Sequence, residues 1–434
     1  MTALPQGWVA CQLMDVASKP EYGWTTAAMQ NLGPRLVRTT DLRGGRIDWS
    51  RAPGCRDLPS SLERYLLQTD DILVSRAGTV GVSTIVTAGP PAVFASYLMR
   101  IRANAAVNPR YLALFLQSPQ YWRQVESFSS GIAIPNINAT KLGGLLLPLP
   151  PAREQQRIVG ALDAHLSRLD AATSALRGTS LRLAALTRAA SAWLWERSVA
   201  SGSAVEIGAT GRVTTGSTPK RNQIGMFGGD LPFVTPSDVD WGGMEVVRTA
   251  RTLSASGAAA VRVLKAGSVL AVCIGATLGK VGWSRSAVAT NQQINGIDIN
   301  ASLARPDFLA ALLSSPQFQE AMWNNASSTT LPILNKRKFA ELSVPLPPRS
   351  SQDALMAEHS AVTSLRMNLA RDVLTAGRRS IALRRSLLNA AFSGRLVPQD
   401  PNDESAELAL QRIQAELVTG VPRARLPRTA SATQ

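Results

Sequence analysis

The chain has 434 residues, and its hydrophobic content of 45% is enough to build ordinary cores in several domains, which argues against global disorder. The 46 Lys and Arg residues outnumber the 30 Asp and Glu residues, and the net charge of +16 indicates a polyanionic partner, most often nucleic acid. A solvated basic surface or an acidic protein partner is the alternative. No apolar run reaches the ~18 residues of a membrane span, no signal peptide is recognisable and the cysteines are scattered. We therefore expect a cytoplasmic protein with no membrane contact, disulfide framework or zinc site.

Residues 1–150 predict a first globular module. The stretch 70–74 is typical of a buried strand that follows a turn, and 109–125 is typical of one helix, or of two helices divided at Ser118-Pro119-Gln120. Glycine, proline and asparagine between such segments mark loops. The mixture indicates an α/β or α+β module of ordinary domain size.

A proline-rich boundary, Pro148-Leu149-Pro150-Pro151, ends this module and opens a long helix over 151–200. Proline stops the strand-like run before it and suits the first turn of the helix after it. From Ile158 onward, residues at alternating spacings of four and three form a heptad pattern, which is typical of a coiled coil and passes through His165. The predicted seam contains Ile158, Leu162, Leu169, Leu176, Leu183 and Leu186.

The same organisation returns further along the chain. Pro345-Leu346-Pro347-Pro348 repeats the boundary at an offset of 345 − 148 = 197 residues, and Ser118-Pro119-Gln120 matches Ser315-Pro316-Gln317 at the same offset. This repeat predicts a second module over 201–348 and a second heptad helix over 349–395. Residues 396–434 predict a short helix and a mobile basic tail. The second seam contains Leu355, Val362, Leu369, Val373, Leu383 and Leu387.

Two heptad helices in one chain are expected to pack on each other. The first helix ends where the second module begins, and that module leads into the second helix, so a compact second module makes the two helices antiparallel. The predicted fold is α+β (mixed α/β), with two similar modules joined by two long antiparallel coiled-coil helices in a pseudo-twofold internal repeat.

A pseudo-twofold pair of basic modules suits a split DNA sequence, because a protein dyad can match two half-sites. Lys and Arg are candidates for phosphate contacts, and Asn and Gln can bond the edge of adenine. For each residue the alternative is an ordinary polar loop or a solvated helix start. The candidate DNA-binding residues of the first module are Lys19, Tyr22, Trp24, Thr25, Arg76, Ser96, Tyr97, Asn138 and Lys141. Those of the second module are Lys220, Arg221, Asn222, Lys280, Asn291, Gln292, Gln293, Asn335, Lys336, Arg337 and Lys338.

No catalytic or metal-ligating constellation is recognisable in the sequence. The stretch 275–281 resembles a phosphate-binding loop but is one residue short and ends in Val281, so a tight turn in a sheet is the favoured interpretation. His165 and His359 both fall on the heptad seams, where packing is the favoured role. We expect a non-catalytic chain with no cofactor of its own.

The chain resembles the specificity subunit of a Type I restriction-modification system over essentially its whole length. The resemblance rests on Leu4-Pro5-Gln6-Gly7-Trp8, Gly216-Ser217-Thr218-Pro219, Phe227 through Phe233, both Pro-Leu-Pro-Pro boundaries, Glu154-Gln155, Arg157-Ile158-Val159 and Ala391 through Leu396. The second boundary departs from the pattern, because Ser351 replaces the glutamate, and the first module has no obvious Gly-Ser-Thr-Pro opening.

This resemblance implies two target recognition domains, each reading half of a bipartite site in double-stranded DNA, and helices that set the spacing between them. It implies docking of two methyltransferase subunits and, in the full complex, of restriction subunits. S-adenosylmethionine, and ATP with magnesium, are then expected in those partners.

Two other functions stay open at this point. The chain could be a structural scaffold whose modules bind proteins instead of DNA. It could also serve a restriction enzyme in which methylation and cleavage are fused in the partner, and the neighbouring genes would distinguish that arrangement.

Overall fold

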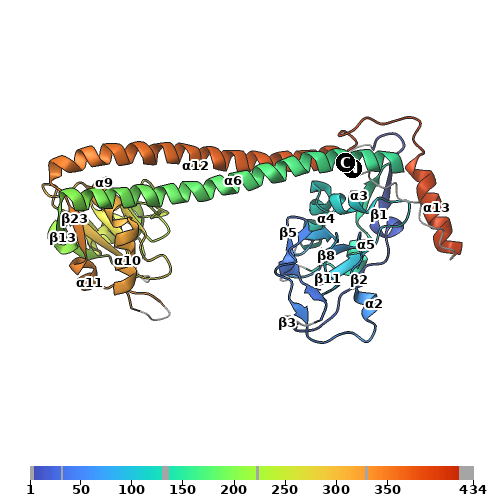
Figure 1. Ribbon diagram of the computed structural model, residues 1–434, viewed down its shortest axis with the longest axis horizontal. Coiled ribbons are helices and arrows are strands. Elements are labelled where there is room, and N and C mark those ends of the chain that lie inside the picture. Colours follow the sequence, from blue (N-terminus) through green and yellow to red (C-terminus); the bar gives the residue numbers. More distant parts are fainter. Residues whose placement is uncertain (1–3, 31–32, 130–135, 221–223, 328–330, 420–434) are drawn as a thin grey trace. The chain divides into compact units, whose positions relative to one another are not determined.

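The computed structural model describes residues 4–30, 33–129, 136–220, 224–327 and 331–419, and it divides into two compact units (Figure 1). Unit 1 comprises Met1–Ser174 and Gly377–Gln434, and unit 2 comprises Ala175–Ala376. Each unit mixes helices with β-sheets, as the sequence predicts, and each is described by itself. The expected basic tail lies largely outside the described residues.

Unit 1 contains two four-stranded sheets, with strand orders β10-β4-β7-β3 and β2-β11-β8-β9, and two-stranded pairs β1-β12 and β5-β6. Every residue of β8 and β11 is buried; β8 begins with the apolar run Ile72-Leu73-Val74 that the sequence shows, whereas buried Arg100 interrupts β11. The strands are β1 Val9–Gln12, β2 Glu21–Tyr22, β3 Ala28–Met29, β4 Arg35–Val37, β5 Leu42–Arg43, β6 Arg46–Ile47, β7 Gly54–Cys55, β8 Ile72–Ser75, β9 Ser83–Ile85, β10 Ala92–Phe94, β11 Leu98–Ile101 and β12 Leu146–Leu149.

Two consecutive helices, α3 (Pro109–Phe115) and α4 (Pro119–Ser129), occupy the stretch that the sequence predicts as helical. The Ser-Pro-Gln tripeptide does divide them, because Pro119 opens α4. The side chain of Asn108 caps α3 by accepting hydrogen bonds from the backbone N–H groups of Arg110 and Tyr111. The shorter helices of the unit are α1 Leu13–Val16, η1 Thr39–Asp41, α2 Leu62–Tyr65 and α5 Ala139–Gly143.

The first proline-rich boundary joins β12 to the long helix α6 (Ala152–Ser201), and a buried glutamine fixes this junction. The side-chain oxygen of Gln155 accepts a hydrogen bond from the backbone N–H of Asn108 at 2.8 Å, and its amide nitrogen donates to the carbonyl of Pro150 at 3.1 Å. The phenol of Tyr111 donates to the carbonyl of Pro148 at 2.7 Å. The start of α6, the end of β12 and the cap of α3 are thus tied together.

Segments from the N-terminal and C-terminal parts of the chain meet in the core of unit 1. Buried Glu154 accepts hydrogen bonds from the Trp8 indole at 3.0 Å and from the Gln399 amide at 3.4 Å. The backbone N–H of Ala406 donates to the carbonyl of Gly7 at 2.9 Å. Phe392, beyond the end of the long helix α12 (Arg349–Ala391), enters the same core and contacts the rings of Tyr111 and Phe115. The short C-terminal helix α13 spans Ala406–Thr419.

Unit 2 repeats this plan with longer strands. Its sheets have the orders β14-β22-β19-β20-β16 and β17-β15-β21-β18, and β13 pairs with β23 as β1 pairs with β12. The strands are β13 Ser203–Glu206, β14 Gly211–Thr215, β15 Phe227–Val234, β16 Met244–Glu245, β17 Arg251–Leu253, β18 Val263–Leu264, β19 Val269–Val272, β20 Val281–Trp283, β21 Val288–Thr290, β22 Ile294–Ile299 and β23 Ser343–Leu346. Its helices besides α6 and α12 are α7 Ile207–Thr210, α8 Ala255–Ala259, α9 Pro306–Leu313, α10 Pro316–Asn325 and α11 Lys336–Glu341.

The second boundary repeats the buried glutamine. Gln352 accepts from the backbone N–H of Arg305 at 2.9 Å and donates to the carbonyls of Leu303 and Pro347 at 2.8 and 3.0 Å. Unit 2 has Ser351 where unit 1 has Glu154, and no chain terminus belongs to unit 2. The two side-chain partners of Glu154 among the described residues, Trp8 and Gln399, belong to the N-terminal and C-terminal segments, so the departure at Ser351 has a physical reason.

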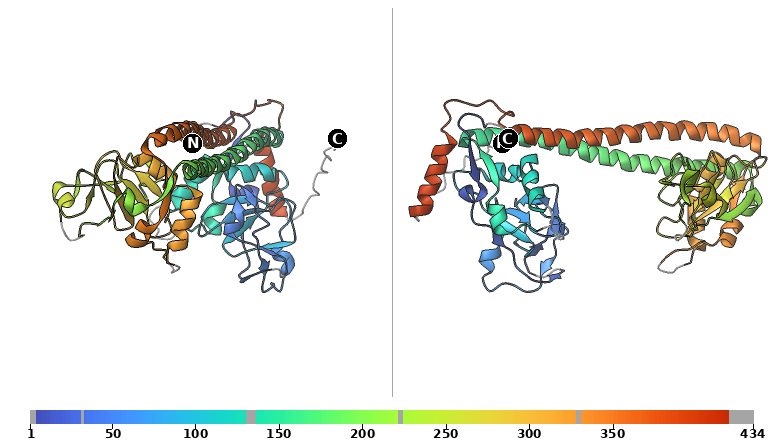
Figure 2. Two further views of the ribbon diagram at one scale, coloured as in Figure 1. Left: turned by 60° about the vertical axis from the view of Figure 1, so that its left-hand side comes forward. Right: turned by 180° about the vertical axis from the view of Figure 1, so that it is seen from behind.

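The two long helices run side by side in each view of the molecule (Figures 1 and 2). Within unit 1, the hydroxyls of Thr173 and Ser380 lie 3.1 Å apart, and Asp170 pairs with Arg384. Residue numbers rise along α6 while they fall along α12, so the helices are antiparallel, as predicted. Among the described residues, no helix is both long enough and apolar enough to cross a membrane.

The contact face of these helices departs from the predicted seam at several positions, where the neighbouring residue is the more buried one. Leu166, 5% exposed, is buried where the seam has the exposed His165, and Met356, 6% exposed, is more buried than Leu355. Ile158, Leu162 and Leu183 are buried, and Leu169, Leu176, Leu355, Val373 and Leu387 are half-buried. Leu186, Val362, Leu369 and Leu383 are 40–51% exposed. The helix ends pack on the cores of the units as well as on each other, so the apolar stripe is wider than one seam.

We expect Gln352→Leu to lower the free energy of unfolding by about 2–4 kcal/mol, because the buried carbonyl of Pro347 and the partly buried carbonyl of Leu303 and N–H of Arg305 would lose their partner. Urea unfolding of the full chain, followed by circular dichroism, measures the effect. Ser351→Ala, one residue away, is the control and should change the free energy by no more than about 0.5 kcal/mol. Equal midpoints for the two variants would contradict the role of Gln352.

Burial raises the pKa of the Glu154 carboxyl above its ordinary value of 4.5, although bonds from Trp8 and Gln399 oppose the shift. The folded chain then binds more protons here than the unfolded chain between pH 4.5 and the raised pKa, so this carboxyl makes stability fall as pH rises through that window. The melting temperature of Glu154→Gln minus that of the natural chain should therefore increase as the pH is raised from 4.5 to neutral. The same substitution at exposed Glu196 is the control, and a melting-temperature difference independent of pH would refute the prediction.

Candidate nucleic-acid interface

The polar loops of the two units occupy equivalent places in their sheets. In unit 1, the backbone N–H groups of Gly23 and Trp24 donate to the carbonyls of Leu98 and Phe94. In unit 2, Gly216 and Ser217 donate in the same way to Ile294 and Thr290. This aligns Gly23-Trp24-Thr25 with Gly216-Ser217-Thr218, so the first module does have an opening of the second module's kind, without the proline.

Both glycines are required by close backbone contacts. A Cβ atom on Gly23 would lie 2.3 Å from the carbonyl oxygens of Phe94 and Ala95. One on Gly216 would lie 2.1 Å from the Thr290 hydroxyl and 2.3 Å from the Asn291 carbonyl oxygen. A glycine followed two residues later by a threonine is therefore the sequence signal for this loop in both units.

Four predicted residues of unit 1 come together beside this loop. The guanidinium of Arg76 lies over the Tyr22 ring, 4.7 Å from its centre, and the Arg76 backbone N–H donates to the carbonyl of Tyr97. The Tyr22 hydroxyl accepts from the backbone N–H of Ala139, next to Asn138. Tyr22 and Tyr97 are exposed, at 42% and 61%. The result is an exposed aromatic and cationic patch that could stack on or hydrogen-bond to a base.

The other candidates of unit 1 are distributed differently. Trp24 is turned inward, since its indole donates to the carbonyl of Asp57 and its ring contacts Tyr65. Asn138 caps α5 through its side-chain oxygen, and Lys141 donates to the carbonyl of Phe128. Lys19 and Thr25 are exposed and Ser96 is half-buried.

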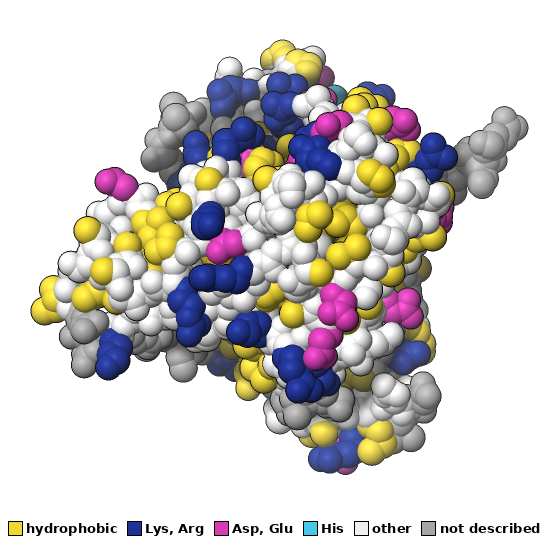
Figure 3. All heavy atoms as spheres, turned by 90° about the vertical axis from the view of Figure 1, so that its left-hand side faces the viewer, with side chains coloured by type: hydrophobic (Ala, Val, Ile, Leu, Met, Phe, Trp, Pro, Cys, Tyr) yellow, Lys and Arg dark blue, Asp and Glu magenta, His cyan; other side chains and the backbone are white. Residues whose placement is uncertain are grey.

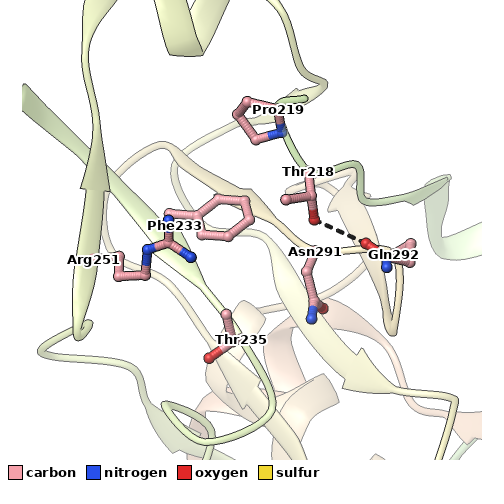
Figure 4. Close-up of a pocket in the computed structure, with 7 residues that line it drawn as sticks. All are labelled: Thr218, Pro219, Phe233, Thr235, Arg251, Asn291 and Gln292. Carbon is pink, nitrogen blue, oxygen red and sulfur yellow. Dashed lines mark hydrogen bonds between the residues drawn. The ribbon is translucent and has the colours of Figure 1, made fainter. Parts of the chain in front are cut away.

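Unit 2 has a pocket of about 400 Å³ at the equivalent loops, lined by Thr218, Pro219, Phe233, Thr235, Arg251, Asn291 and Gln292. Figure 4 shows Arg251 and Phe233 on one side and Thr218, Asn291 and Gln292 on the other. The Thr218 hydroxyl donates to the side-chain oxygen of Gln292 at 2.8 Å, and the Asn291 amide donates to that of Gln293 at 2.9 Å. The amides of this wall are thus held in place while Gln292 stays exposed.

Arg251 was not among the candidates from the sequence. It begins β17 directly opposite Phe233, and its guanidinium lies 3.7 Å from the centre of the Phe227 ring. No sequence signal marks it, because the position 197 residues earlier is Gly54 and lies in a shorter strand. The stack is visible only once β15 and β17 are paired.

The remaining candidates of unit 2 lie outside the pocket lining. Lys280 donates to the carbonyl of Pro236. It lies in the stretch 275–281, which contains the turn between β19 and β20, as the interpretation as a tight turn in a sheet predicted. Asn335 caps α11, and Lys338 donates to the carbonyl of Asn325. Lys220, Lys336 and Arg337 are exposed, and Arg221 and Asn222 lie outside the described residues.

Charge does not single out one region of the face drawn in Figure 3. On the face drawn in Figure 3, Lys and Arg side chains lie at separate places among uncharged ones, with Asp and Glu between them. Within the described part of the chain, no group of three or more His, Cys, Asp or Glu residues is arranged to hold a metal ion. What distinguishes the loop regions is the combination of cation, aromatic ring and amide.

A family model described as Type I restriction modification DNA specificity domain matches residues 16–176 and again 204–358, which together are more than half of the chain. The chain belongs to this family. The match confirms the family that the motifs indicated, and with it the prediction of a specificity chain instead of an enzyme. The doubled match also agrees with the internal repeat.

Two proteins with similar sequences are named as specificity subunits of Type I restriction enzymes. The Type I restriction enzyme EcoAI specificity subunit of Escherichia coli is 26% identical over 199 residues, which cover 43% of this chain and 34% of the relative. The Type I restriction enzyme HindI specificity subunit of Haemophilus influenzae is 29% identical over 140 residues, covering 32% and 30%. The matched part of the chain thus spans about a third of the length of these curated relatives.

A solved structure concerned with complex assembly and conformational transition of the type I R-M system contains a similar chain. Its TM-score is 0.69 at 19% identity, and the match covers 91% of this chain and 100% of that one. This likeness shows that the two chains share their fold.

We expect Gly216→Ala to destabilise unit 2 by about 1–3 kcal/mol, because the new methyl group would displace the loop from Thr290 and Asn291. Gly23→Ala should act in the same way on unit 1. Gly160→Ala, on α6 with nothing within 4 Å of the new Cβ, is the control and should stabilise the chain by about 0.5–1 kcal/mol. Thermal unfolding measures all three, and a neutral Gly216→Ala would show that the loop has room to move.

Proposed function

We propose that this chain is the DNA sequence-recognition subunit of a Type I restriction-modification complex. Each unit reads one half of a bipartite site in double-stranded DNA through its polar loops, and the paired helices α6 and α12 set the spacing between the halves. The observation that carries the proposal is the doubled match to one DNA specificity family, on two units of the same plan with different loop residues.

The different loop residues support two different half-sites. Unit 1 presents Tyr22, Arg76 and Tyr97 around its loop, whereas unit 2 presents Thr218, Arg251 and Gln292. Stacking and hydrogen bonding to base edges need such aromatic, cationic and amide groups. The net charge of +16 supports a general attraction to the phosphate backbone.

The proposed partners follow from the family. Two methyltransferase subunits would dock on the chain, and restriction subunits would join them in the full complex. S-adenosylmethionine, and ATP with magnesium, would bind to those partners. The exposed leucine and valine side chains on α6 and α12, among them Leu186, Val362 and Leu369, support the use of the helices for docking.

The test is to co-express the chain with the methyltransferase encoded beside it and to sequence the methylated bases of the host genome. We expect one bipartite motif with a fixed gap. Exchange of residues 201–347 for the corresponding segment of another family member should change one half-site and leave the other as it was. Methylation that ignores this exchange would refute the assignment.

Two alternatives are distinguished by other observations. A protein-binding scaffold would show DNA binding by the assembled complex that is absent or insensitive to salt, whereas phosphate contacts make affinity fall steeply with salt. A specificity chain that serves a fused methyltransferase-nuclease would be encoded beside that single partner, without a separate helicase-nuclease gene.

A further inference from the structure

The pocket of unit 2 contains a cation whose position is fixed before any ligand arrives. Arg251 stacks on Phe227 at 3.7 Å, and Phe227 meets the buried Phe233 edge-on at 5.8 Å between ring centres. The backbone on either side is also held, because Ala250 donates to Asp238 at 2.9 Å and the Thr249 hydroxyl donates to the Arg251 carbonyl at 2.8 Å. An arginine fixed in this way loses little conformational entropy on binding.

The hydrogen-bonding capacity of this guanidinium is unused. Within the described part of the chain, Arg251 makes no ion pair and donates no side-chain hydrogen bond that would compete with a ligand. Other arginines of unit 2 are engaged: Arg285 pairs with Glu245, and Arg262 donates to the carbonyl of Thr215. The planar donor edge of Arg251 is thus available at the pocket wall (Figure 4).

The surroundings favour a base over a phosphate. Of the described residues that line the pocket, only Arg251 is charged, and the facing wall consists of Thr218, Asn291 and Gln292. A phosphate site would gather several cations or backbone N–H groups, whereas uncharged amides and hydroxyls complement the mixed donors and acceptors of base edges. Among the bases, guanine offers the two adjacent acceptors, O6 and N7, that match an arginine fork.

We propose that Arg251 is a specificity-determining residue that reads the guanine of one G·C pair in the half-site of unit 2. Phe227 is a positioning residue that holds the guanidinium flat. This inference rests on the proposed function, since it assumes that unit 2 contacts DNA. Beyond that function, it names the residue that contacts the base, the base that is recognised and the side of the pocket on which the contact is made.

The experiment begins with the methylome of the natural chain co-expressed with its methyltransferase, which returns the target site. The purified complex is then titrated with a duplex that carries this site and with a panel in which each base pair of the unit 2 half-site is replaced in turn. The variants are Arg251→Met, which keeps the length and an apolar stack but removes the donors, and Arg251→Lys, which keeps the charge without the fork. Arg285→Met is the matched control, because Arg285 also lies over an aromatic ring, Trp283, but does not line the pocket.

For the natural complex and the control, we expect replacement of one G·C pair to weaken binding by about 10- to 100-fold. For Arg251→Met, that replacement should have almost no further effect, while replacements at the other pairs keep theirs. Arg251→Lys should keep most of the overall affinity and lose part of the discrimination at the same pair. Equal melting temperatures of the variants exclude a folding defect, and if Arg251→Met is unfolded, the Arg251→Lys result decides.

Two outcomes would overturn the inference. Uniform weakening on every duplex, with a shallower salt dependence, would make Arg251 a phosphate contact. Unchanged discrimination at every pair would leave it without a role in reading. If the natural chain returns no methylated motif at all, the proposed function itself fails, so the two failures are distinguishable.

Discussion

One buried side-chain amide in each unit determines how that unit is joined to its long helix. Gln155 and Gln352 follow the proline-rich boundaries, and each links the strand before the boundary, the helix after it and the segment before α3 or α9. A buried amide must have its donors and acceptor satisfied, so the three elements can meet in only one way. Hydrogen bonds of these amides therefore hold the boundary against the start of the helix, in addition to the apolar packing there.

A fixed frame allows the polar loops to vary. In both units a glycine lets the first loop pass directly over the turn between two strands, and an arginine lies on an aromatic ring nearby. The arginines occupy different places: Arg76 follows β8, while Arg251 begins β17. Both units therefore hold an arginine against an aromatic ring, but the arginine comes from a different part of each unit. This is what would be expected of two modules of one origin that face different ligands.

The frame was largely predictable from the sequence. The proline boundaries, the repeat offset and the heptad helices each leave a local or periodic signal, and the structure has the antiparallel pair and the doubled module that they indicate. The seam register was not predictable, since Leu166 and Leu194 are buried by globular cores that a heptad pattern does not represent.

The candidate site was predictable only in part. Asn138 and Asn335 are polar and each follows a proline three residues earlier, yet their side-chain oxygens cap short helices, and the sequence does not distinguish this use from base reading. Arg251 gave no signal at all, because its importance depends on strand pairing with β15. Pairing across a sheet joins residues that no local pattern connects.

The discontinuity of unit 1 affects the order in which the chain can fold during synthesis. Unit 2 is one continuous stretch, Ala175–Ala376, and all of its residues are available before the last part of the chain leaves the ribosome. Unit 1 needs Phe392, Ala406 and Ile413 to complete its core, so its N-terminal portion must wait with Tyr111 and Phe115 incompletely covered. Domains that await a distant segment expose apolar surface in the meantime. A chain that stops near the end of α12 would therefore complete one unit and leave the other with an open core, so the segment from Phe392 to Ile413 is needed to close the core of the N-terminal module.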